Sequence, residues 1–164
     1  MTEDEGPKVA IIYGSPSDAN VMSQAGAMLE RFGVTWDEVS ISAHRAPRRL
    51  LDWLSELEPR GIEVVIAGAG MSAALPGVVA AHTALPVIGV PIRGGAMDGL
   101  DSLLSISQMP PGVPVACVGL DNAKNAAVLA VQILSVADSD LRAKVWKFKD
   151  DFESAAAAAM DNRG

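Results

Sequence analysis

The stretch Val9-Ala10-Ile11-Ile12-Tyr13-Gly14 indicates the first element of the fold. Five consecutive apolar residues closed by a glycine are typical of a strand buried on both faces of a parallel sheet. Ser17-Asp18 then offers a helix cap, and apolar residues recur at helical spacing until Gly33. A buried strand that leads directly into an amphipathic helix predicts the first unit of an α/β fold.

The same alternation continues to the end of the chain. Further strands are expected at 34–41, 62–67, 86–91 and 113–118, and further helices at 47–57, 75–83, 99–107, 122–136 and 139–160. Five apolar strands alternating with helices predict a three-layer αβα architecture. We expect a flavodoxin-like, doubly wound parallel sheet of five strands in the order 2-1-3-4-5, with a C-terminal helix. Residues 1–164 are expected to form a single domain, with a core of about 9–136 and a helix of about 139–160.

Composition narrows the class of protein. Hydrophobic residues make up 49% of the 164 residues and charged residues 20%, which is typical of a globular chain. No apolar run approaches the roughly 18 residues that span a bilayer, the acidic N-terminus lacks a signal-peptide pattern, and Cys117 has no partner for an internal disulfide. The net charge of −7 disfavours nucleic acid and anionic lipid. We therefore expect a cytoplasmic protein that binds neither nucleic acid nor membrane.

Residues 62–119 are unusually poor in charge. Within them the only charged residues are Glu63, Arg93, Asp98 and Asp101. A stretch that includes surface helices and carries so little charge favours burial against other subunits, so a homo-oligomer is expected. The alternative is that the stretch simply supplies the core strands.

Three polar or glycine-rich loops are expected at one edge of the sheet. They are 14–18, 42–45 and 68–72, which follow the first, second and third strands. In doubly wound sheets, ligands bind beyond the carboxyl ends of the strands, where the strand order reverses. The predicted topology therefore brings these loops to one crevice.

Loops 14–18 and 42–45 contain side chains suited to a ribonucleotide site. Asp18 would repel a phosphate but can accept hydrogen bonds from ribose hydroxyls, although Ser17 and Asp18 could equally be helix caps. His44 is a proton carrier near neutral pH, and Arg45 matches a phosphate or carboxylate. A structural role for His44 is the alternative. The third loop, Gly68-Ala69-Gly70, lacks the third glycine of a dinucleotide fingerprint. Its glycines either let the backbone approach a ligand closely or form a tight turn.

The residues also carry a family resemblance. Gly14-Ser15-x-Ser17-Asp18, Ser42-Ala43-His44-Arg45-x-Pro47 and Gly68-Ala69-Gly70 together resemble N5-carboxyaminoimidazole ribonucleotide mutase, class I of the purine biosynthesis carboxylase family. Segment 99–110, with Gly112-Val113-Pro114-Val115 and Asn125-Ala126 after it, supports the same resemblance. The match covers roughly residues 9–134, and its motifs are highly specific in combination.

The resemblance implies an isomerase of de novo purine biosynthesis that works without metal or organic cofactor. The enzyme would release carbon dioxide from the exocyclic nitrogen of the substrate and attach it to ring carbon four inside a closed pocket. His44 matches the acid/base, and the residues that match substrate-binding positions are Ser15, Ser17, Asp18, Ser42, Arg45, Ala69 and Gly70. By the same resemblance, the partners would be a small-molecule ribonucleotide and other copies of the chain in an octamer.

Two departures from the family pattern matter, and both lie after the third strand. Where the family usually has Gly-Ala-Gly-Gly-Ala-Ala-His-Leu-Pro-Gly, this chain has Met71 in place of a glycine and Ala74 in place of the histidine. His82 lies about 12 Å further along a helix and cannot replace that histidine within one chain. Either the missing histidine only assists binding, or the site has drifted toward the direct carboxylase or another ring substrate. A non-catalytic ribonucleotide-binding assembly protein and a flavin-binding protein are further alternatives. The loop at 93–97 is either a lid or a plain connector.

Overall fold

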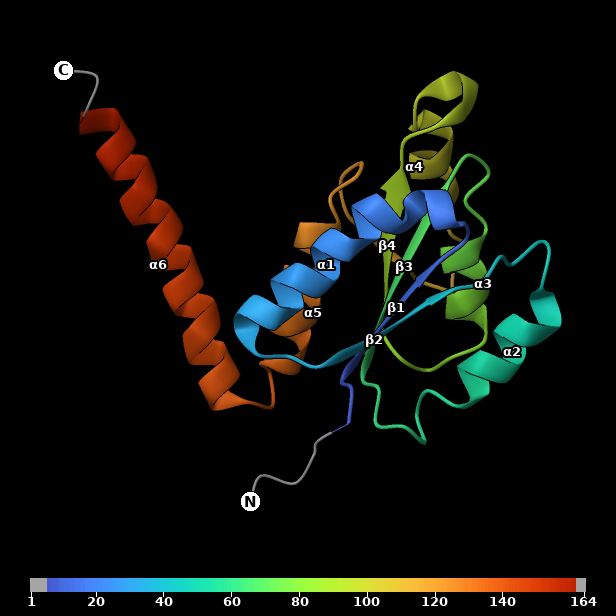
Figure 1. The fold of residues 1–164 in the computed structure, drawn as a ribbon, viewed down its shortest axis with the longest axis horizontal. Coiled ribbons are helices and arrows are strands. Elements are labelled where there is room, and N and C mark those ends of the chain that lie inside the picture. The colour runs from blue at the N-terminus through green and yellow to red at the C-terminus, as the bar shows by residue number, and fades with distance from the viewer. Residues whose placement is uncertain (1–5, 162–164) are drawn as a thin grey trace.

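The computed structural model describes residues 6–161, and its central element is a parallel sheet (Figure 1). The strands are β1 (Val9–Tyr13), β2 (Trp36–Ser40), β3 (Val64–Gly70), β4 (Val87–Ile92) and β5 (Ala116–Cys117). They pair in the order β2-β1-β3-β4-β5, and every pair is parallel. The expected doubly wound, flavodoxin-like topology is therefore confirmed.

Helices cover both faces of this sheet. They are α1 (Ala19–Phe32), α2 (Pro47–Ser55), α3 (Leu75–Ala81), α4 (Leu100–Ser107), α5 (Ala123–Leu134) and α6 (Ser139–Asp161). Figure 1 shows α1 and α5 on one side of the sheet and α2 and α3 on the other, while α6 leans away from the body. The arrangement is the expected three-layer αβα architecture with a C-terminal helix.

The side chains of β1 point alternately to the two faces of the sheet, which explains why helices must cover both faces. Val9, Ile11 and Tyr13 join the apolar cluster under α1 and α5, whereas Ala10 and Ile12 join the cluster under α2, α3 and α4. All five side chains are buried. Because alternate side chains of a strand point to opposite faces, an uninterrupted apolar strand is stable only between two covering layers.

Strand β3 is longer than expected. It continues through Gly68, Ala69 and Gly70, which the sequence predicts to be a loop after the strand. A Cβ atom at Gly68 would lie 2.3 Å from the sulfur of Met22 in α1, so this glycine makes room for helix packing. The two glycines are thus strand residues, and neither forms a turn.

Strand β5 is shorter than expected, because only residues 116–117 pair with β4, against the expected 113–118. Pro114 has no amide hydrogen and cannot donate to the ladder, which is why proline is confined to sheet edges and strand ends. The Val118 amide still donates to the Gly89 carbonyl at 3.1 Å. The outer edge of the sheet is therefore short and partly exposed.

Helix α6 is anchored by its first half. Leu141 and Val145 are buried in the cluster under α1 and α5, and the ring of Phe148 packs against Phe32 with centroids 5.1 Å apart. Trp146 and Phe152 are each 63% exposed. Within residues 6–161, no helix combines the length and the apolar character needed to cross a membrane.

Candidate functional site

A cleft of about 510 Å³ opens at the carboxyl ends of β1, β2 and β3. All eight residues singled out from the sequence line it: Ser15, Ser17, Asp18, Ser42, His44, Arg45, Ala69 and Gly70. The topology brings these segments together because parallel strands end at the same edge of the sheet. The convergence expected from the loops is what the fold produces.

The loop after β1 is organised by short-range hydrogen bonds. The Ser15 hydroxyl accepts from the Ser17 hydroxyl at 2.9 Å and from the Ser17 amide at 3.4 Å, and it caps the short 3₁₀ turn Pro16–Asp18. Asp18 stands at the N-cap position of α1, yet its side chain makes no capping hydrogen bond. A carboxylate that the helix does not use remains available to a ligand.

The carboxyl group of Asp18 has a raised pKa. Partial burial is the main cause, because it disfavours the charged form, and hydrogen bonds from Ser17 and the Ser15 backbone act in the opposite direction. The Ser17 hydroxyl donates to Oδ1 of Asp18 at 3.3 Å. The group is therefore partly desolvated but still in contact with the Ser17 hydroxyl, which suits an acceptor for the hydroxyls of a sugar.

The loop after β2 is tied to the loop after β1 by Arg45. Its guanidinium donates to the Gly14 carbonyl at 3.4 Å, and its amide donates to the Ser42 hydroxyl at 3.3 Å. Arg45 precedes α2, so it does not share a helix face with Arg49. The charged guanidinium of Arg45 therefore lies at the wall of the cleft and not on α2.

His44 is exposed within the cleft lining. Among the groups that the structure describes, none hydrogen-bonds to its imidazole. An exposed imidazole in a cleft can exchange protons with a bound molecule. This placement favours a functional role for His44 over a structural one.

The remaining wall comes from the end of β3 and the start of α3. Ala69 is buried, Ala74 is the N-cap residue of α3, and both line the cleft. His82 is the C-cap residue of the same helix, where Nδ1 lies 2.9 Å from the Val78 carbonyl. It is thus at the far end of α3 from the position that Ala74 occupies.

Met71 is the cleft residue whose geometry the sequence did not reveal. Its φ angle is 52°, in the left-handed region that side chains other than glycine rarely adopt, and its side chain is 60% exposed. The sequence shows that Met71 replaces a glycine of the family. Its left-handed backbone is set by the place where β3 ends, which the sequence does not show. Other lining residues that we had not singled out are Gly14, Ala43, Ser72, Ala73 and Leu75.

The residues of this cleft do not resemble a metal centre. Among the described residues, no three histidine, cysteine, aspartate or glutamate side chains gather as metal ligands would. The lining groups are hydroxyls, one carboxylate, one imidazole and one guanidinium, together with apolar side chains. Such a set suits a polar, anionic small molecule that bears sugar hydroxyls.

Comparison with known proteins places this architecture in a family. The family model described as AIR carboxylase matches residues 8–155. The chain is 56% identical over 147 residues to the N5-carboxyaminoimidazole ribonucleotide mutase of Pyrococcus abyssi, covering 90% of this chain and 84% of that protein. It is 53% identical to the phosphoribosylaminoimidazole carboxylase of Saccharomyces cerevisiae over 87% of this chain but 25% of that protein. The crystal structure of Treponema denticola PurE matches with a TM-score of 0.83 and 31% identity, covering 94% of this chain and 95% of that one.

Proposed function

The chain belongs to the AIR carboxylase family, and on this basis we propose that it converts N5-carboxyaminoimidazole ribonucleotide into 4-carboxy-5-aminoimidazole ribonucleotide. The observation that carries the proposal is the meeting of Asp18, His44 and Arg45 in one cleft. These residues come from two loops, and together they match the three parts of such a substrate. The ribose needs acceptors, the phosphate needs a cation, and the ring needs a proton carrier.

In this proposal, Asp18 and Arg45 hold the ribonucleotide at its two polar ends. The Asp18 carboxylate accepts hydrogen bonds from ribose hydroxyls, and the Arg45 guanidinium pairs with the phosphate. Ser15 adds a hydroxyl that is already oriented by Ser17. Ser42, Ala69 and Gly70 line the space for the ring, where small side chains let the backbone approach a ligand closely.

The reaction is balanced within the substrate. The bond between the exocyclic nitrogen and its carboxylate breaks, and its electron pair stays on the nitrogen as carbon dioxide leaves. Ring carbon four then attacks the carbon dioxide. His44 removes the proton from that carbon and delivers a proton to the nitrogen. No net electron or proton is gained or lost, so the step is an isomerisation.

The cleft must hold the released carbon dioxide between the two steps. A trapped molecule is recaptured in an effectively intramolecular reaction, which is much faster than capture from solution. Exclusion of water also keeps the liberated carbon dioxide from being hydrated. The apolar side chains of the lining, among them Ala69, Ala73 and Leu75, suit this retention.

The share of each relative that the chain covers favours the mutase over the direct carboxylase. The chain covers 84% of the archaeal mutase but only a quarter of the yeast carboxylase. The two reactions share the same product and differ in the source of carbon dioxide. The direct carboxylase is therefore the second candidate, and the fate of the carboxylate distinguishes the two.

We also infer that the working form is a homo-oligomer in the cytoplasm. The charge-poor segment exposes Met97, Leu100 and Leu104, each close to half exposed, which favours their burial against other copies. An octamer is the assembly that the family resemblance implies. These side chains come from residues after β4 and not from the polar loops of the cleft.

An isotope experiment tests the proposed reaction. Purified protein receives N5-carboxyaminoimidazole ribonucleotide labelled with carbon-13 in its carboxylate, in an excess of unlabelled bicarbonate. Retention of the label in the carbon-four product is the expected result. Loss of the label to the unlabelled pool would identify the direct carboxylase, and absence of turnover would contradict both functions.

A further inference from the structure

Arg48 and Arg49 are two exposed cations without an ion-pair partner among the described residues. Each of the other arginines between residues 6 and 161 has a contact of its own, with a carboxylate, a backbone carbonyl or, for Arg31, the ring of Phe148. Neither Arg48 nor Arg49 hydrogen-bonds to any group that the structure describes. The guanidinium is always charged, so both charges remain available to solutes.

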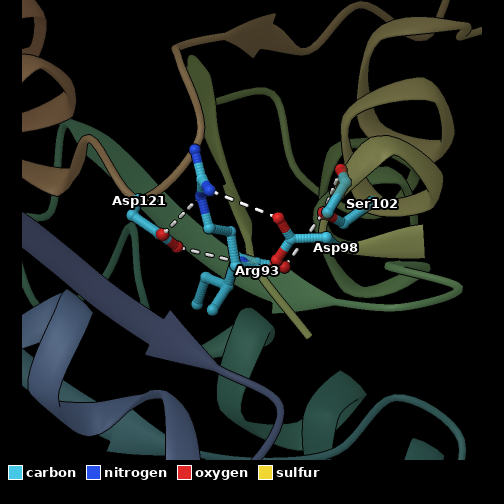
Figure 2. A network of polar contacts seen from close by, with 6 residues as sticks. Arg93, Asp98, Ser102 and Asp121 are labelled. Atoms are coloured by element: carbon cyan, nitrogen blue, oxygen red, sulfur yellow. Dashed lines mark hydrogen bonds and ion pairs between the residues drawn. The ribbon is translucent and has the colours of Figure 1, made fainter. Parts of the chain in front are cut away.

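Arg93, at the same edge of the sheet, shows the opposite arrangement (Figure 2). Its guanidinium forms ion pairs with Asp98 and Asp121, each at 3.3 Å, and its backbone amide donates to Asp121 at 2.9 Å. Two carboxylates therefore more than cancel the charge of this arginine. Unpaired arginine charge at this edge of the sheet is consequently concentrated on the side of β2.

The two unpaired arginines stand close to the cleft without lining it. They are the second and third residues of α2, and the turn that leads into this helix contains the lining residues His44 and Arg45. Arg48 is three residues after Arg45, so their Cα atoms are at most about 11 Å apart. This separation is close to the Debye length of about 10 Å at 0.1 M ionic strength, and it lies well within the longer Debye length of dilute salt. The field of these charges therefore reaches the cleft.

The start of α2 is an unfavourable place for these cations. The dipole of a helix disfavours positive charge in the first turn, and this turn has no acidic residue to offset it. Ala46, at the N-cap position, offers no side-chain cap. The acidic residue of this helix, Asp52, lies one turn beyond Arg48 and forms no ion pair with it. Helix stability therefore does not account for two arginines at this place.

The proposed substrate is an anion, and so is the protein. A ribonucleotide that bears a phosphate and a carboxylate is repelled by a chain whose formal net charge is −7. Asp18 adds a carboxylate to the lining of the cleft itself. A positive patch beside the cleft opposes this repulsion where the substrate must enter, which raises the local substrate concentration and the rate of encounter.

We propose that Arg48 and Arg49 steer the anionic substrate into the cleft, so that they accelerate its association without contacting it in the bound complex. The inference rests on the proposed function, because it requires a phosphorylated and carboxylated ligand. In that function Arg45 holds the bound phosphate, and Arg48 and Arg49 act before this contact forms. They are positioning residues for the encounter and take no part in proton transfer.

Variants that remove or keep the two charges separate steering from a structural role. The test variant is Arg48→Gln/Arg49→Gln, and Arg48→Lys/Arg49→Lys keeps both charges. The matched control, Lys124→Gln/Lys149→Gln, removes two exposed cations from α5 and α6 and, like the test variant, lowers the formal net charge from −7 to −9. Stopped-flow mixing with 4-carboxy-5-aminoimidazole ribonucleotide measures the association and dissociation rates between about 20 and 500 mM ionic strength, a range over which screening becomes strong.

The test variant is expected to associate about five- to tenfold more slowly than wild type at the lowest ionic strength, because steering acts on the encounter. The difference should shrink to less than about twofold at the highest ionic strength, where the charges are screened. The KM value should rise in dilute salt, while the dissociation rate and kcat stay within about twofold of wild type. The lysine variant and the matched control should associate at the wild-type rate.

Three results would overturn the proposal. One is an equal association rate of wild type and the test variant in dilute salt. Another is slow association that persists at high ionic strength or that the matched control shares, since neither fits a local electrostatic effect. A changed assembly mass in the test variant, measured by light scattering, would assign the two arginines to a subunit contact instead.

A measurement without substrate separates this proposal from the proposed function. Trp53 lies one turn after Arg49 on α2 and is half-buried, so its fluorescence reports solutes at this face. In a protein that carries Trp36→Phe and Trp146→Phe, iodide should quench Trp53 about twofold less after the Arg48→Gln/Arg49→Gln change, because fewer anions gather there. Quenching by neutral acrylamide should not change. A wild type that binds no ribonucleotide would contradict the proposed function, whereas equal iodide quenching would overturn the steering proposal alone.

Discussion

The loops after β1 and β2 and the segment after β4 leave the same edge of the sheet, yet they expose opposite kinds of side chain. The first two present Asp18, His44 and Arg45 to the cleft. Residues 93–107 present Met97, Leu100 and Leu104, each close to half exposed. In the function that we propose, the polar loops carry the chemistry and the apolar segment forms contacts between subunits. If so, each function can be removed without the other.

The largest effect is expected from His44→Asn. Loss of the proton carrier should lower kcat by about 10²- to 10⁴-fold, the usual contribution of a general acid or base. Because His44 is exposed, the unfolding temperature and the assembly mass should not change. Steady-state kinetics, calorimetry and light scattering provide the three readouts.

His82→Asn is the matched control, since His82 is also exposed but lies at the far end of α3. It should keep kcat within about twofold of wild type, as surface substitutions away from a site usually do. An active His44→Asn protein would show that the polar loops do not carry the chemistry.

Leu104→Asp tests the other half of the comparison. A carboxylate placed in an apolar subunit interface should raise the dissociation constant by about 10²-fold or more, because an unpaired buried charge is very costly. Light scattering across a dilution series would detect the smaller species. Leu51→Asp changes a leucine of similar exposure on α2 and should leave the assembly intact. If both variants keep the wild-type mass, the segment after β4 is not the interface.

Asp18→Asn is expected to weaken substrate binding. Losing a charged acceptor for ribose hydroxyls should raise KM by about 10- to 100-fold, the equivalent of one charged hydrogen bond. The kcat value should change much less, because Asp18 contacts the ribose and takes no part in the proton transfer in the proposed arrangement. Unchanged KM would mean that the ribose lies elsewhere.

The same substitution has a predicted effect on stability. Burial raises the pKa of Asp18 above the usual 3.8, so the folded state binds its proton more tightly than the unfolded state. The carboxylate therefore destabilises the fold at neutral pH, and this cost disappears as the pH falls through the raised pKa. Asp18→Asn should unfold at a higher temperature than wild type at pH 7, and the two proteins should converge in acid. A lower unfolding temperature at pH 7 would contradict the assigned cause.

Ala74→His should produce the smallest change. If the family histidine only assists binding, restoring it should lower KM by at most about tenfold, the value of one hydrogen bond, and leave kcat near wild type. Loss of activity in this variant would instead indicate that the cleft is shaped around Ala74 for another ring substrate. Steady-state kinetics of Ala74→His and of the wild type, measured in parallel, distinguish these two explanations of Ala74.

Much of the fold could be predicted because its signals are local. The apolar run in β1 predicts that strand. The helical spacing of apolar residues in α1 and the glycine at position 33 predict that helix and its end. The alternation of strands and helices then limits the possible topologies. The length of β3 could not be predicted in this way. Gly68 is needed by Met22 of another element, and a sequence reader cannot distinguish such a glycine from one in a turn.

The cleft was predictable to a similar extent. Asp18, His44 and Arg45 stand directly after strands whose carboxyl ends must meet, so their convergence follows from topology alone. The backbone of Met71 and the hydrogen bond from Arg45 to Gly14 depend on how separate loops pack. Contacts of that kind have no counterpart in residue spacing, which is why they required the structure.

The two histidines allow a direct test of where the ribonucleotide binds. Protein labelled with carbon-13 at the histidine ring gives one NMR signal for His44 and one for His82. The His82→Asn variant assigns the two signals. Addition of 4-carboxy-5-aminoimidazole ribonucleotide should shift the His44 signal saturably and leave the His82 signal in place. Binding that leaves His44 unmoved, or that shifts His82 instead, would contradict the assignment of the active site to this cleft.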